Sequence, residues 1–285
     1  MPSLLKFADS DYTYEEAKFV IFGVPFDGTT SFRGGARFAP NAIREASINL
    51  ESFVYDKSFN MKNAKIHDFG NLDEQGRVED VVNDVKFNLG KILDDNKFPL
   101  MLGGEHSITI GSAKALKNYD YAMIFIDAHS DFRESYLGVE YSHACVSKRS
   151  FEYLGKERIA SIGVRSVSPE EYDDPEFKDF YHKTAFYVHK NGIERTFDEI
   201  LNYLGKKQIY LSIDMDGIDP SFAPGVATPE PFGISTWDLI YVIDKIGKRL
   251  IGADIVEISP PFDNGNTSML AARLVQEIIS SKGNF

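Results

Sequence analysis

The sequence predicts an α/β fold of three layers, with helices on both faces of a parallel β-sheet (an α/β/α sandwich). Short apolar runs recur along the chain, and several lack alternation between apolar and polar residues, as expected of strands buried on both faces. Segments with helical periodicity separate these runs. Strands that alternate with helices form a parallel sheet covered on both sides. No linker divides the chain, so we expect a single domain spanning residues 1–285.

Seven apolar runs are predicted to be strands. They occupy residues 19–24, 99–102, 122–126, 159–164, 185–188, 209–213 and 255–258. Helices are predicted over residues 81–93, 235–246 and 266–279, because apolar residues recur there on one face. Ser235 is a plausible N-cap for the second of these helices.

Composition and charge exclude several classes of protein. The 285 residues are 43% hydrophobic and carry a net charge of −12, which argues against nucleic-acid binding because phosphate recognition needs clustered lysine and arginine. Cys145 is the single cysteine, so we expect no internal disulfide. The use of a single cysteine is also typical of a protein in a reducing compartment. Residues 1–11 lack a basic and apolar leader, and no apolar run approaches the roughly 18 residues of a membrane helix. We therefore expect a cytoplasmic protein.

Acidic and histidine residues follow four of the predicted strands. The segments that follow them are Gly103-Gly104-Glu105-His106, Asp127-Ala128-His129-Ser130-Asp131, Asp214-Met215-Asp216 and Glu257. Parallel strands end at one edge of a sheet, where ligands bind in α/β folds. In extended backbone, Asp127, His129 and Asp131 point the same way, since side chains alternate with a period of two.

This set of residues predicts a metal centre. A single aspartate after a strand usually caps a helix or forms a turn, but clustered buried carboxylates would repel one another without cations among them. The proposed ligands are His106, Asp127, His129, Asp131, Asp214 and Asp216. Six such ligands are too many for one tetrahedral zinc and suit two ions, and oxygen-rich ligation favours Mn²⁺. Two divalent ions balance four aspartates, so a bridging hydroxide and Glu257 would leave the site anionic and suited to a guanidinium cation.

The three motifs resemble the signatures of the ureohydrolase family, over roughly residues 23–259. They are Gly103-Gly104-Glu105-His106-Ser107, Asp127-Ala128-His129-Ser130-Asp131 and Ser212-Ile213-Asp214-Met215-Asp216-Gly217-Ile218-Asp219-Pro220. The resemblance implies an arginase-like fold with about eight parallel strands. It also implies two Mn²⁺ ions per subunit, homo-oligomers (trimers or hexamers), and hydrolysis of a guanidino compound to urea and an amine.

The resemblance also implies a role for individual residues. Asp127 and Asp214 would bridge the metals, and His106 and Asp131 would be terminal ligands, with Asp131 also delivering a proton to the leaving amine. His143 matches a histidine that shuttles protons, for which the usual pKa range of histidine is suitable. Glu257 matches the glutamate that holds the guanidinium, and Thr228 aligns with a threonine near the substrate.

Within the family, residues 23–38 look like the amino-terminal signature of agmatinases. Ser166 and Ser168 stand where arginases carry carboxylates that hold the ammonium of an amino acid. The resemblance therefore implies hydrolysis of agmatine to putrescine and urea. Enzymes acting on guanidinobutyrate, guanidinopropionate, arginine or formiminoglutamate remain alternatives, because they share the metal ligands.

Several residues have two possible interpretations. Arg133 either salt-bridges an acidic substrate tail or, as we prefer, pairs with an acid such as Glu134 or Glu140. Glu230 either orients a distal ammonium or fixes a loop. Cys145 is interpreted as a packing residue rather than a nucleophile. His67, His182 and His189 are expected to be surface or hydrogen-bonding residues, and Gly34-Gly35 a turn rather than a phosphate loop.

Two rival functions are considered. A mononuclear zinc deacylase of the histone-deacetylase type shares the general fold, but it would not need His106, Asp131 and Asp216 together. A non-catalytic metal-binding scaffold is disfavoured because His143 and Glu257, which only a reaction needs, are both present.

Overall fold

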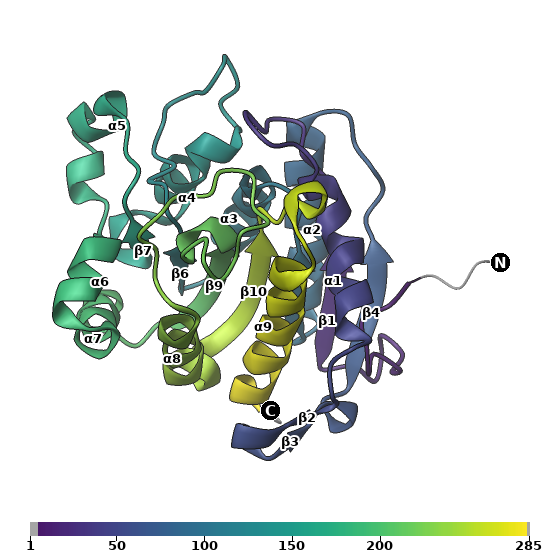
Figure 1. Ribbon diagram of the computed structural model, residues 1–285. Coiled ribbons are helices and arrows are strands. Elements are labelled where there is room, and N and C mark those ends of the chain that lie inside the picture. The colour runs from purple at the N-terminus through teal and green to yellow at the C-terminus, as the bar shows by residue number, and fades with distance from the viewer. Residues whose placement is uncertain (1–4, 284–285) are drawn as a thin grey trace.

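The central sheet of the computed structural model holds eight strands in the order β4-β1-β5-β10-β9-β6-β7-β8, and all neighbours pair in parallel (Figure 1). The structure describes residues 5–283, so the first four residues of the segment 1–11 considered above lie outside the described residues. The strands are β1 (Phe19–Gly23), β4 (Ile66–Asn71), β5 (Phe98–Leu102), β6 (Tyr121–Ile126), β7 (Ile159–Val164), β8 (His182–Thr184), β9 (Gln208–Asp214) and β10 (Leu250–Val256). A separate antiparallel pair is formed by β2 (Phe53–Val54) and β3 (Phe59–Asn60). The expected α/β/α architecture with about eight parallel strands is confirmed.

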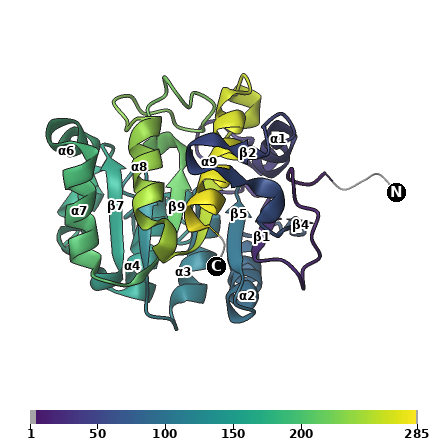
Figure 2. The same ribbon diagram turned by 90° about the horizontal axis from the view of Figure 1, so that it is seen from below.

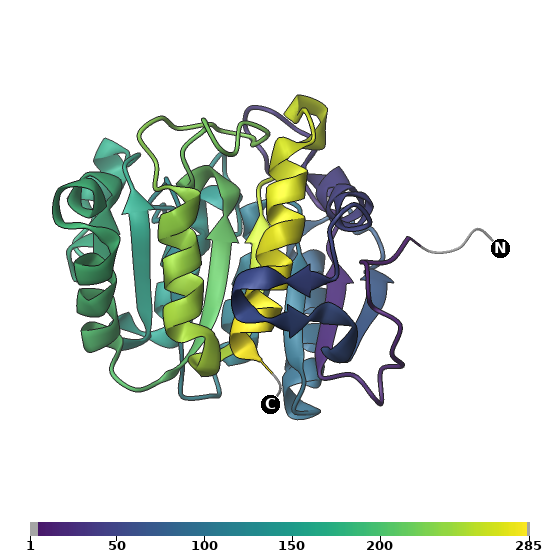
Figure 3. The same ribbon diagram turned by 60° about the horizontal axis from the view of Figure 1, so that its bottom comes forward.

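Helices cover both faces of this sheet. They are α1 (Ala39–Ser47), α2 (Val78–Asp94), α3 (Thr109–Leu116), α4 (Val146–Leu154), α5 (Pro169–Asp173), α6 (Ala185–Asn191), α7 (Ile193–Leu204), α8 (Thr236–Ile246) and α9 (Asn266–Lys282). Helices α1, α7, α8 and α9 pack on one face, and α2, α3 and α4 pack on the other (Figure 2). Figure 3 shows the strand arrowheads pointing to one end, where the longest loops gather.

Burial on both faces explains why the strand sequences do not alternate. In β1, Phe19 and Ile21 join the core beneath α1 and α9, whereas Val20 and Phe22 join the core beneath α2 and α3. Every residue of β1 is buried. A strand with helices on both sides needs apolar residues at consecutive positions, which is the pattern that predicted these strands.

Most predicted elements are confirmed, and one is wrong. Residues 185–188 begin α6 rather than a strand, because the Thr184 side chain caps the helix by accepting a hydrogen bond from the Tyr187 amide. Ala185 and Val188 are buried while Phe186 is exposed, which is a helical pattern. Four apolar residues in a row cannot distinguish these two structures.

The start of β10 and the two edge strands were predicted less well than the other strands of the sheet. Strand β10 begins at Leu250, five residues before the predicted start, and ends before Glu257. Strands β4 and β8 were missed, because they lie at the two edges of the sheet and their sequences mix polar with apolar residues.

The predicted helices appear as α2, α8 and α9, and Ser235 caps α8 in a capping box with Asp238. Within residues 5–283, no helix is long and apolar enough to cross a membrane.

A buried ion pair fastens edge strand β4 to helix α1. Arg44 donates from Nε and Nη2 to the two oxygens of Asp68, at 2.8 and 2.9 Å, and both residues are almost fully buried. Asp68 also accepts a hydrogen bond from the Phe7 amide. A polar residue in β4 is therefore part of the core on this side of the sheet.

We predict that Asp68→Ala lowers the free energy of unfolding by about 3–5 kcal/mol, because the Arg44 charge would remain buried without its partner. Asp179→Ala is the matched control, since it removes a comparable pair with Lys156 whose side chains are 54% and 57% exposed. The control should lose less than about 1 kcal/mol. Denaturant unfolding of both variants measures the difference, and equal losses would contradict the prediction.

Candidate metal centre

Four adjacent strands at the middle of the sheet deliver the predicted metal-site residues to one edge. His106 follows β5, Asp127 follows β6 and Glu257 follows β10, whereas Asp214 is the last residue of β9. These strands are neighbours in the order β5-β10-β9-β6. Residues more than 100 positions apart in the sequence are thereby placed at a single point, as expected at the carboxyl ends of parallel strands.

Two glycines allow the backbone to come close enough for this convergence. A Cβ atom on Gly104 would lie 2.0 Å from the carbonyl oxygen of Phe26, and one on Gly217 would lie 2.7 Å from the amide nitrogen of Asp127. Both distances are too short for any side chain. Glycine is therefore required where the loop after β5 meets the amino-terminal loop and where the loop after β9 meets the start of the Asp-x-His-x-Asp motif.

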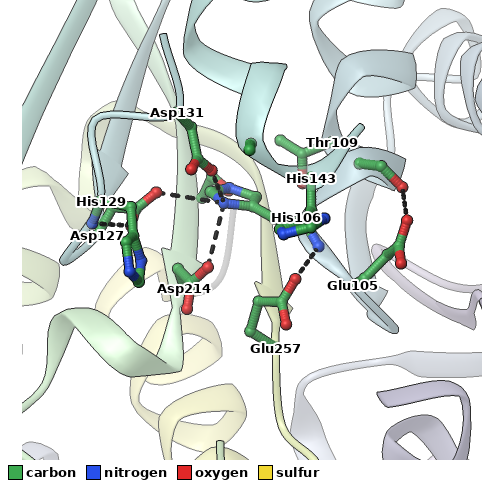
Figure 4. Close-up of polar contacts among 12 residues, drawn as sticks. Glu105, His106, Thr109, Asp127, His129, Asp131, His143, Asp214 and Glu257 are labelled. Atoms are coloured by element: carbon green, nitrogen blue, oxygen red, sulfur yellow. Dashed lines mark hydrogen bonds and ion pairs between the residues drawn. The ribbon is translucent and has the colours of Figure 1, made fainter. Parts of the chain in front are cut away.

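Three carboxylates surround the imidazole of His106. Its Nδ1 atom lies 3.3 Å from Asp127, 3.2 Å from Asp131 and 3.2 Å from Asp214 (Figure 4). Among the buried atoms of residues 5–283, His106 Nδ1 and Asp127 Oδ2 have no hydrogen-bond partner. Burying a polar atom without a hydrogen bond is unfavourable in free energy. Two such atoms that face each other are therefore evidence for a cation that binds both of them.

The second histidine lies on the other side of Asp127. His129 Nδ1 is 3.0 Å from Asp216 and 3.9 Å from Asp127. Two sets of ligand atoms are close enough to hold an ion, namely His106 with Asp127 and Asp214, and Asp127 with His129 and Asp216. Asp127 belongs to both sets, so its carboxylate would be able to help hold either ion.

Each of three aspartates has one oxygen anchored by the backbone and one directed inward. Asp127 Oδ1 accepts from the His129 amide at 2.7 Å, and Asp214 Oδ1 accepts from the Asp216 amide at 2.9 Å. Asp216 Oδ1 accepts from the Ala128 amide at 3.1 Å. The opposite Oδ2 atoms face the two imidazoles. The aspartates are thus held in place for ligation, as required of a preorganised metal site.

The donor set therefore fits a pair of divalent ions. Carboxylate oxygens and imidazole nitrogens are the ligands that manganese accepts, and neither of the two groups of candidate ligands contains a cysteine. Asp131, whose carboxylate is 3.2 Å from His106 Nδ1, completes the set of six residues expected from the sequence. Asp131 has a φ of 46°, and Glu257 one of 65°, in the left-handed region that non-glycine residues seldom adopt. Strained backbone of this kind is concentrated at functional sites.

Crowded carboxylates change the acid–base behaviour of the cluster. Burial, together with the charge of Asp127, raises the pKa of Asp131 to about 7. Burial and the charges of Asp216 and Asp127 raise the pKa of Asp214 well above its usual range. For His106, burial alone would lower the pKa, but the three carboxylates around it outweigh burial and raise the pKa. Positive charge is therefore favoured at this edge of the sheet.

Glu257 lies beside the cluster and is fixed through the backbone. Its Oε1 accepts a hydrogen bond from the His106 amide at 2.6 Å (Figure 4). Burial, followed by the charge of Glu105, raises the pKa of Glu257 to about 8. A buried carboxylate whose ionised form is disfavoured in this way gains by the arrival of a cation.

His143 lies on the other side of the cavity and is held by the amino-terminal loop. Its Nδ1 atom is 3.2 Å from Thr29 Oγ1, and its Nε2 atom is 3.4 Å from Ser31 Oγ. Thr29 Oγ1 in turn donates to the buried carboxylate of Glu105 at 2.6 Å. Burial lowers the pKa of His143, so that its neutral form is available at neutral pH.

A cavity of about 170 Å³ opens above the cluster. Its walls include five of the six proposed ligands, all except Asp127, and Glu257 together with Ser31, Arg133, Tyr136, His143, Ala144, Ser166, Ser168, Glu171 and Thr228. Thr228 Oγ1 donates to Asp216 Oδ2 at 3.2 Å, so the threonine is both in the wall and in contact with a proposed ligand.

Comparison with known proteins agrees with this geometry. The sequence profile described as "Arginase family" matches residues 17–280. The chain belongs to the arginase family. It is 36% identical to an agmatinase of Halalkalibacterium halodurans, over 96% of this chain and 95% of that protein. It is also 36% identical to an N(1)-aminopropylagmatine ureohydrolase of Thermococcus kodakarensis, over 95% of this chain and 93% of that protein.

A solved structure supports the same assignment. The agmatine ureohydrolase of Thermoplasma volcanium is 48% identical to this arginase-family chain and superimposes with a TM-score of 0.95, covering 98% of this chain and 94% of that one. The resemblance to the ureohydrolase family that the sequence motifs suggested is therefore confirmed.

The partner of Arg133 in this arginase-family protein differs from the partners considered above. Arg133 donates to Glu170 at 2.7 Å, and its Nε lies 4.0 Å from Glu171. Glu134 pairs with Arg149 instead, at 3.1 Å. The expectation that Arg133 pairs with an acid is confirmed, but the acid comes from α5 rather than from the same loop, because the sheet brings the loops after β6 and β7 together.

Glu230 contacts a proposed ligand. Its carboxylate is 3.6 Å from His129 Nε2, the ring nitrogen opposite the one that faces Asp216. The backbone oxygen of Glu230 accepts from Arg165, which also donates to the backbone oxygen of Asp216. Glu230 is thus placed to orient His129, a role that was not among the two interpretations considered from the sequence.

The residues interpreted as structural have ordinary surroundings. Cys145 is buried, and burial raises the pKa of its thiol to about 12, so it is unreactive. His67 and His182 hydrogen-bond backbone oxygens at 2.8 and 2.9 Å, and His189 is exposed on α6. Gly35 has a φ of 121° and lies in a turn, as expected.

Sequence reasoning missed several residues that support the site. Glu105 was quoted as part of a motif but given no role, although it receives hydrogen bonds from Thr29 and Thr30. Asp254, in the middle of β10, was not singled out, although it is fully buried. A charged residue within a predicted buried strand is the signal that could have found it.

We predict that metal removal destabilises the protein more strongly as pH rises. Asp131 has its pKa raised from about 4 to about 7, so between these values the folded metal-free chain holds a proton that the unfolded chain releases, and stability falls as pH rises through that window. The raised pKa values of His106 and His129 act in the same direction above about pH 6.5.

Melting temperatures with Mn²⁺ and after chelation, measured from about pH 5 to about pH 8, test this linkage. The gap between the two melting temperatures should widen with pH. A constant gap would contradict the prediction, and His67→Gln provides a control outside the cluster whose gap should follow that of the unmodified protein.

Proposed function

We propose that this chain is an agmatinase that hydrolyses agmatine to putrescine and urea with two Mn²⁺ ions bound by His106, Asp127, His129, Asp131, Asp214 and Asp216. The observation that carries the proposal is the anionic centre beneath the cavity, where four aspartates and Glu257 converge. Two divalent ions would balance the aspartates and leave Glu257 to receive a cation. A guanidinium group suits this carboxylate in charge and in its N–H donors.

The metal pair, when bound, would supply an activated water and positive charge for attack at the guanidinium carbon. Glu257 would hold the guanidinium, since the hydrogen bond from the His106 amide fixes its carboxylate at the edge of the cluster. Burial lowers the pKa of His143, and its Nε2 lies 3.4 Å from Ser31 Oγ in the wall of the cavity, so the unprotonated imidazole could carry a proton between solvent and the leaving amine. Thr228 borders the substrate through its contact with Asp216.

The side chains that line the cavity favour a substrate whose tail carries no carboxylate. Ser166 and Ser168 line the cavity, and Ser168 caps helix α5 together with Glu171. Both oxygens of Glu171 are occupied, because they accept from Ser130, from the Phe132 amide and from the Ser168 amide. Arg133 is paired with Glu170, so an acidic tail would have to displace Glu170 from the only arginine among the cavity-lining residues.

The direct test is urea release by Mn²⁺-loaded protein from agmatine, arginine and 4-guanidinobutanoate in parallel. Agmatine should give the highest kcat/KM. Glu257→Gln should lower kcat/KM for agmatine by about 100-fold or more while leaving the metal content at two, because a buried hydrogen-bonded charge pair is worth about 2–5 kcal/mol. Absence of urea from every guanidino compound would refute the hydrolase function. Preference for arginine would refute only the choice of agmatine.

A second candidate substrate, 4-guanidinobutanoate, is favoured by one observation. The side chain of Glu170 is 81% exposed, so its pair with Arg133 is screened by water and readily broken. Arg133 lines the cavity and would then be available to an acidic tail.

We predict that Glu170→Gln raises the ratio of kcat/KM for 4-guanidinobutanoate to that for agmatine by about fivefold, since an exposed pair contributes up to about 1 kcal/mol. Glu176→Gln is the matched control, because Glu176 pairs with Lys148 and does not line the cavity. An unchanged ratio in Glu170→Gln, or an equal change in the control, would show that Arg133 does not bind the carboxylate of the substrate tail.

A cytoplasmic location stays a prediction from the composition of the sequence, and assembly into trimers or hexamers stays a prediction from the family resemblance. So does the choice of manganese, which metal analysis of the purified protein would settle.

A further inference from the structure

His106 is the start of a buried hydrogen-bond chain that leads away from the proposed metal centre. Its Nε2 atom lies 3.2 Å from Ser212 Oγ in β9, and Ser212 Oγ donates to Asp254 Oδ1 in β10 at 2.6 Å. Ser212 and Asp254 are opposite each other in the register of the two strands. All three side chains are almost completely buried, so water does not compete for these hydrogen bonds.

The direction of the hydrogen bonds along this chain follows from counting hydrogens. An ionised carboxylate only accepts, so the single hydroxyl hydrogen of Ser212 points to Asp254. Ser212 Oγ can then only accept from His106, which requires the proton of the imidazole to be on Nε2. Nε2 therefore keeps a hydrogen, and Nδ1, which lacks a hydrogen-bond partner and faces the carboxylates, is the ring nitrogen whose lone pair a metal can bind once Nδ1 carries no proton.

The carboxylates by themselves would favour the opposite arrangement. Asp127, Asp131 and Asp214 lie 3.2–3.3 Å from Nδ1, and each would accept a hydrogen bond from a protonated Nδ1. A proton on Nδ1 blocks ligation, because a metal binds the lone pair of a neutral imidazole nitrogen. A second acceptor at Nε2 is therefore needed to make the metal-binding tautomer the stable one.

We infer that Ser212 and Asp254 form a relay that holds the proton of His106 on Nε2 and so prepares Nδ1 to bind one of the two metal ions. They are positioning residues, since neither contacts the cavity. Histidine ligands commonly donate their second N–H to a carboxylate, and here a serine hydroxyl transmits the effect of the carboxylate. The inference rests on the proposed metal centre and does not depend on the substrate.

A purely structural role for Asp254 makes a different prediction. Asp254 also accepts from Thr109 Oγ1 at 3.2 Å, and Thr109 has no part in the chain to His106. If Asp254 only satisfied buried hydroxyl groups, loss of Thr109 and loss of Ser212 would have the same effect on metal binding. If the relay operates, Ser212 alone affects the metal near His106.

The test is calorimetric titration of Mn²⁺ into chelator-treated protein, with metal content measured after dialysis. Ser212→Ala and Asp254→Asn should weaken binding of one of the two ions by about 10- to 100-fold, while the ion near His129 is much less affected. In Asp254→Asn, the amide N–H would donate to Ser212 Oγ, so the Ser212 hydroxyl hydrogen would point to His106 Nε2. The His106 proton would then be on Nδ1, which is the tautomer that cannot bind a metal through Nδ1. Thr109→Val is the matched control, and Ser212→Thr, which keeps the hydroxyl, should bind both ions normally.

Proton positions give a second measurement that does not use affinity. In ¹⁵N-histidine NMR of the protein loaded with diamagnetic Zn²⁺, the unmodified chain and Ser212→Thr should show a slowly exchanging proton on His106 Nε2, assigned by its absence in His106→Ala. The inference is overturned by normal affinity for both ions in Ser212→Ala and Asp254→Asn, by an equal loss in Thr109→Val, or by a proton on Nδ1. Because no substrate is used, these outcomes are independent of whether agmatine is hydrolysed.

Discussion

Repulsion among buried carboxylates is the constraint on which the rest of the site depends. Asp127, Asp131 and Asp214 converge on one imidazole nitrogen at the edge of the sheet, where desolvation makes uncompensated negative charge costly. The fold can hold them there only because backbone amides bind one oxygen of several aspartates and because cations can occupy the space between the other oxygens. The preference for a cationic substrate follows from the same charge balance.

A serine or threonine hydroxyl group lies between a buried carboxylate and each of two imidazoles of the proposed site. Ser212 lies between Asp254 and His106, and Thr29 lies between Glu105 and His143. The carboxylate is thereby kept one residue away from the anionic centre, where a further negative charge would add to the repulsion. Each arrangement joins residues from three separate segments of the sequence, which only the fold brings together.

The residues proposed to contact the substrate tail belong to loops and a short helix rather than to the central strands. The metal ligands follow central strands and are mostly buried, whereas Arg133 and Glu170 belong to loops and to the short helix α5, and Glu170 is exposed. Relatives named agmatinase, N(1)-aminopropylagmatine ureohydrolase and guanidinobutyrase are 31–36% identical to this chain. Loops carried on a fixed scaffold allow specificity to change without disturbing the metal centre.

The sequence by itself determined the strands at the centre of the sheet and the residue types of the metal site. Burial on both faces imposes continuous apolar runs, and period-two spacing places Asp127, His129 and Asp131 on one side of the backbone. Local patterns could not decide residues 185–188, the polar edge strand β4 or the true partner of Arg133, because these depend on which elements become neighbours. The tertiary structure alone places β10 between β5 and β9, and this strand order brings Asp254 beside Ser212 and Ser212 beside His106. Proton positions in the site are set by contacts between strands that are far apart in the sequence, and no local pattern encodes such contacts.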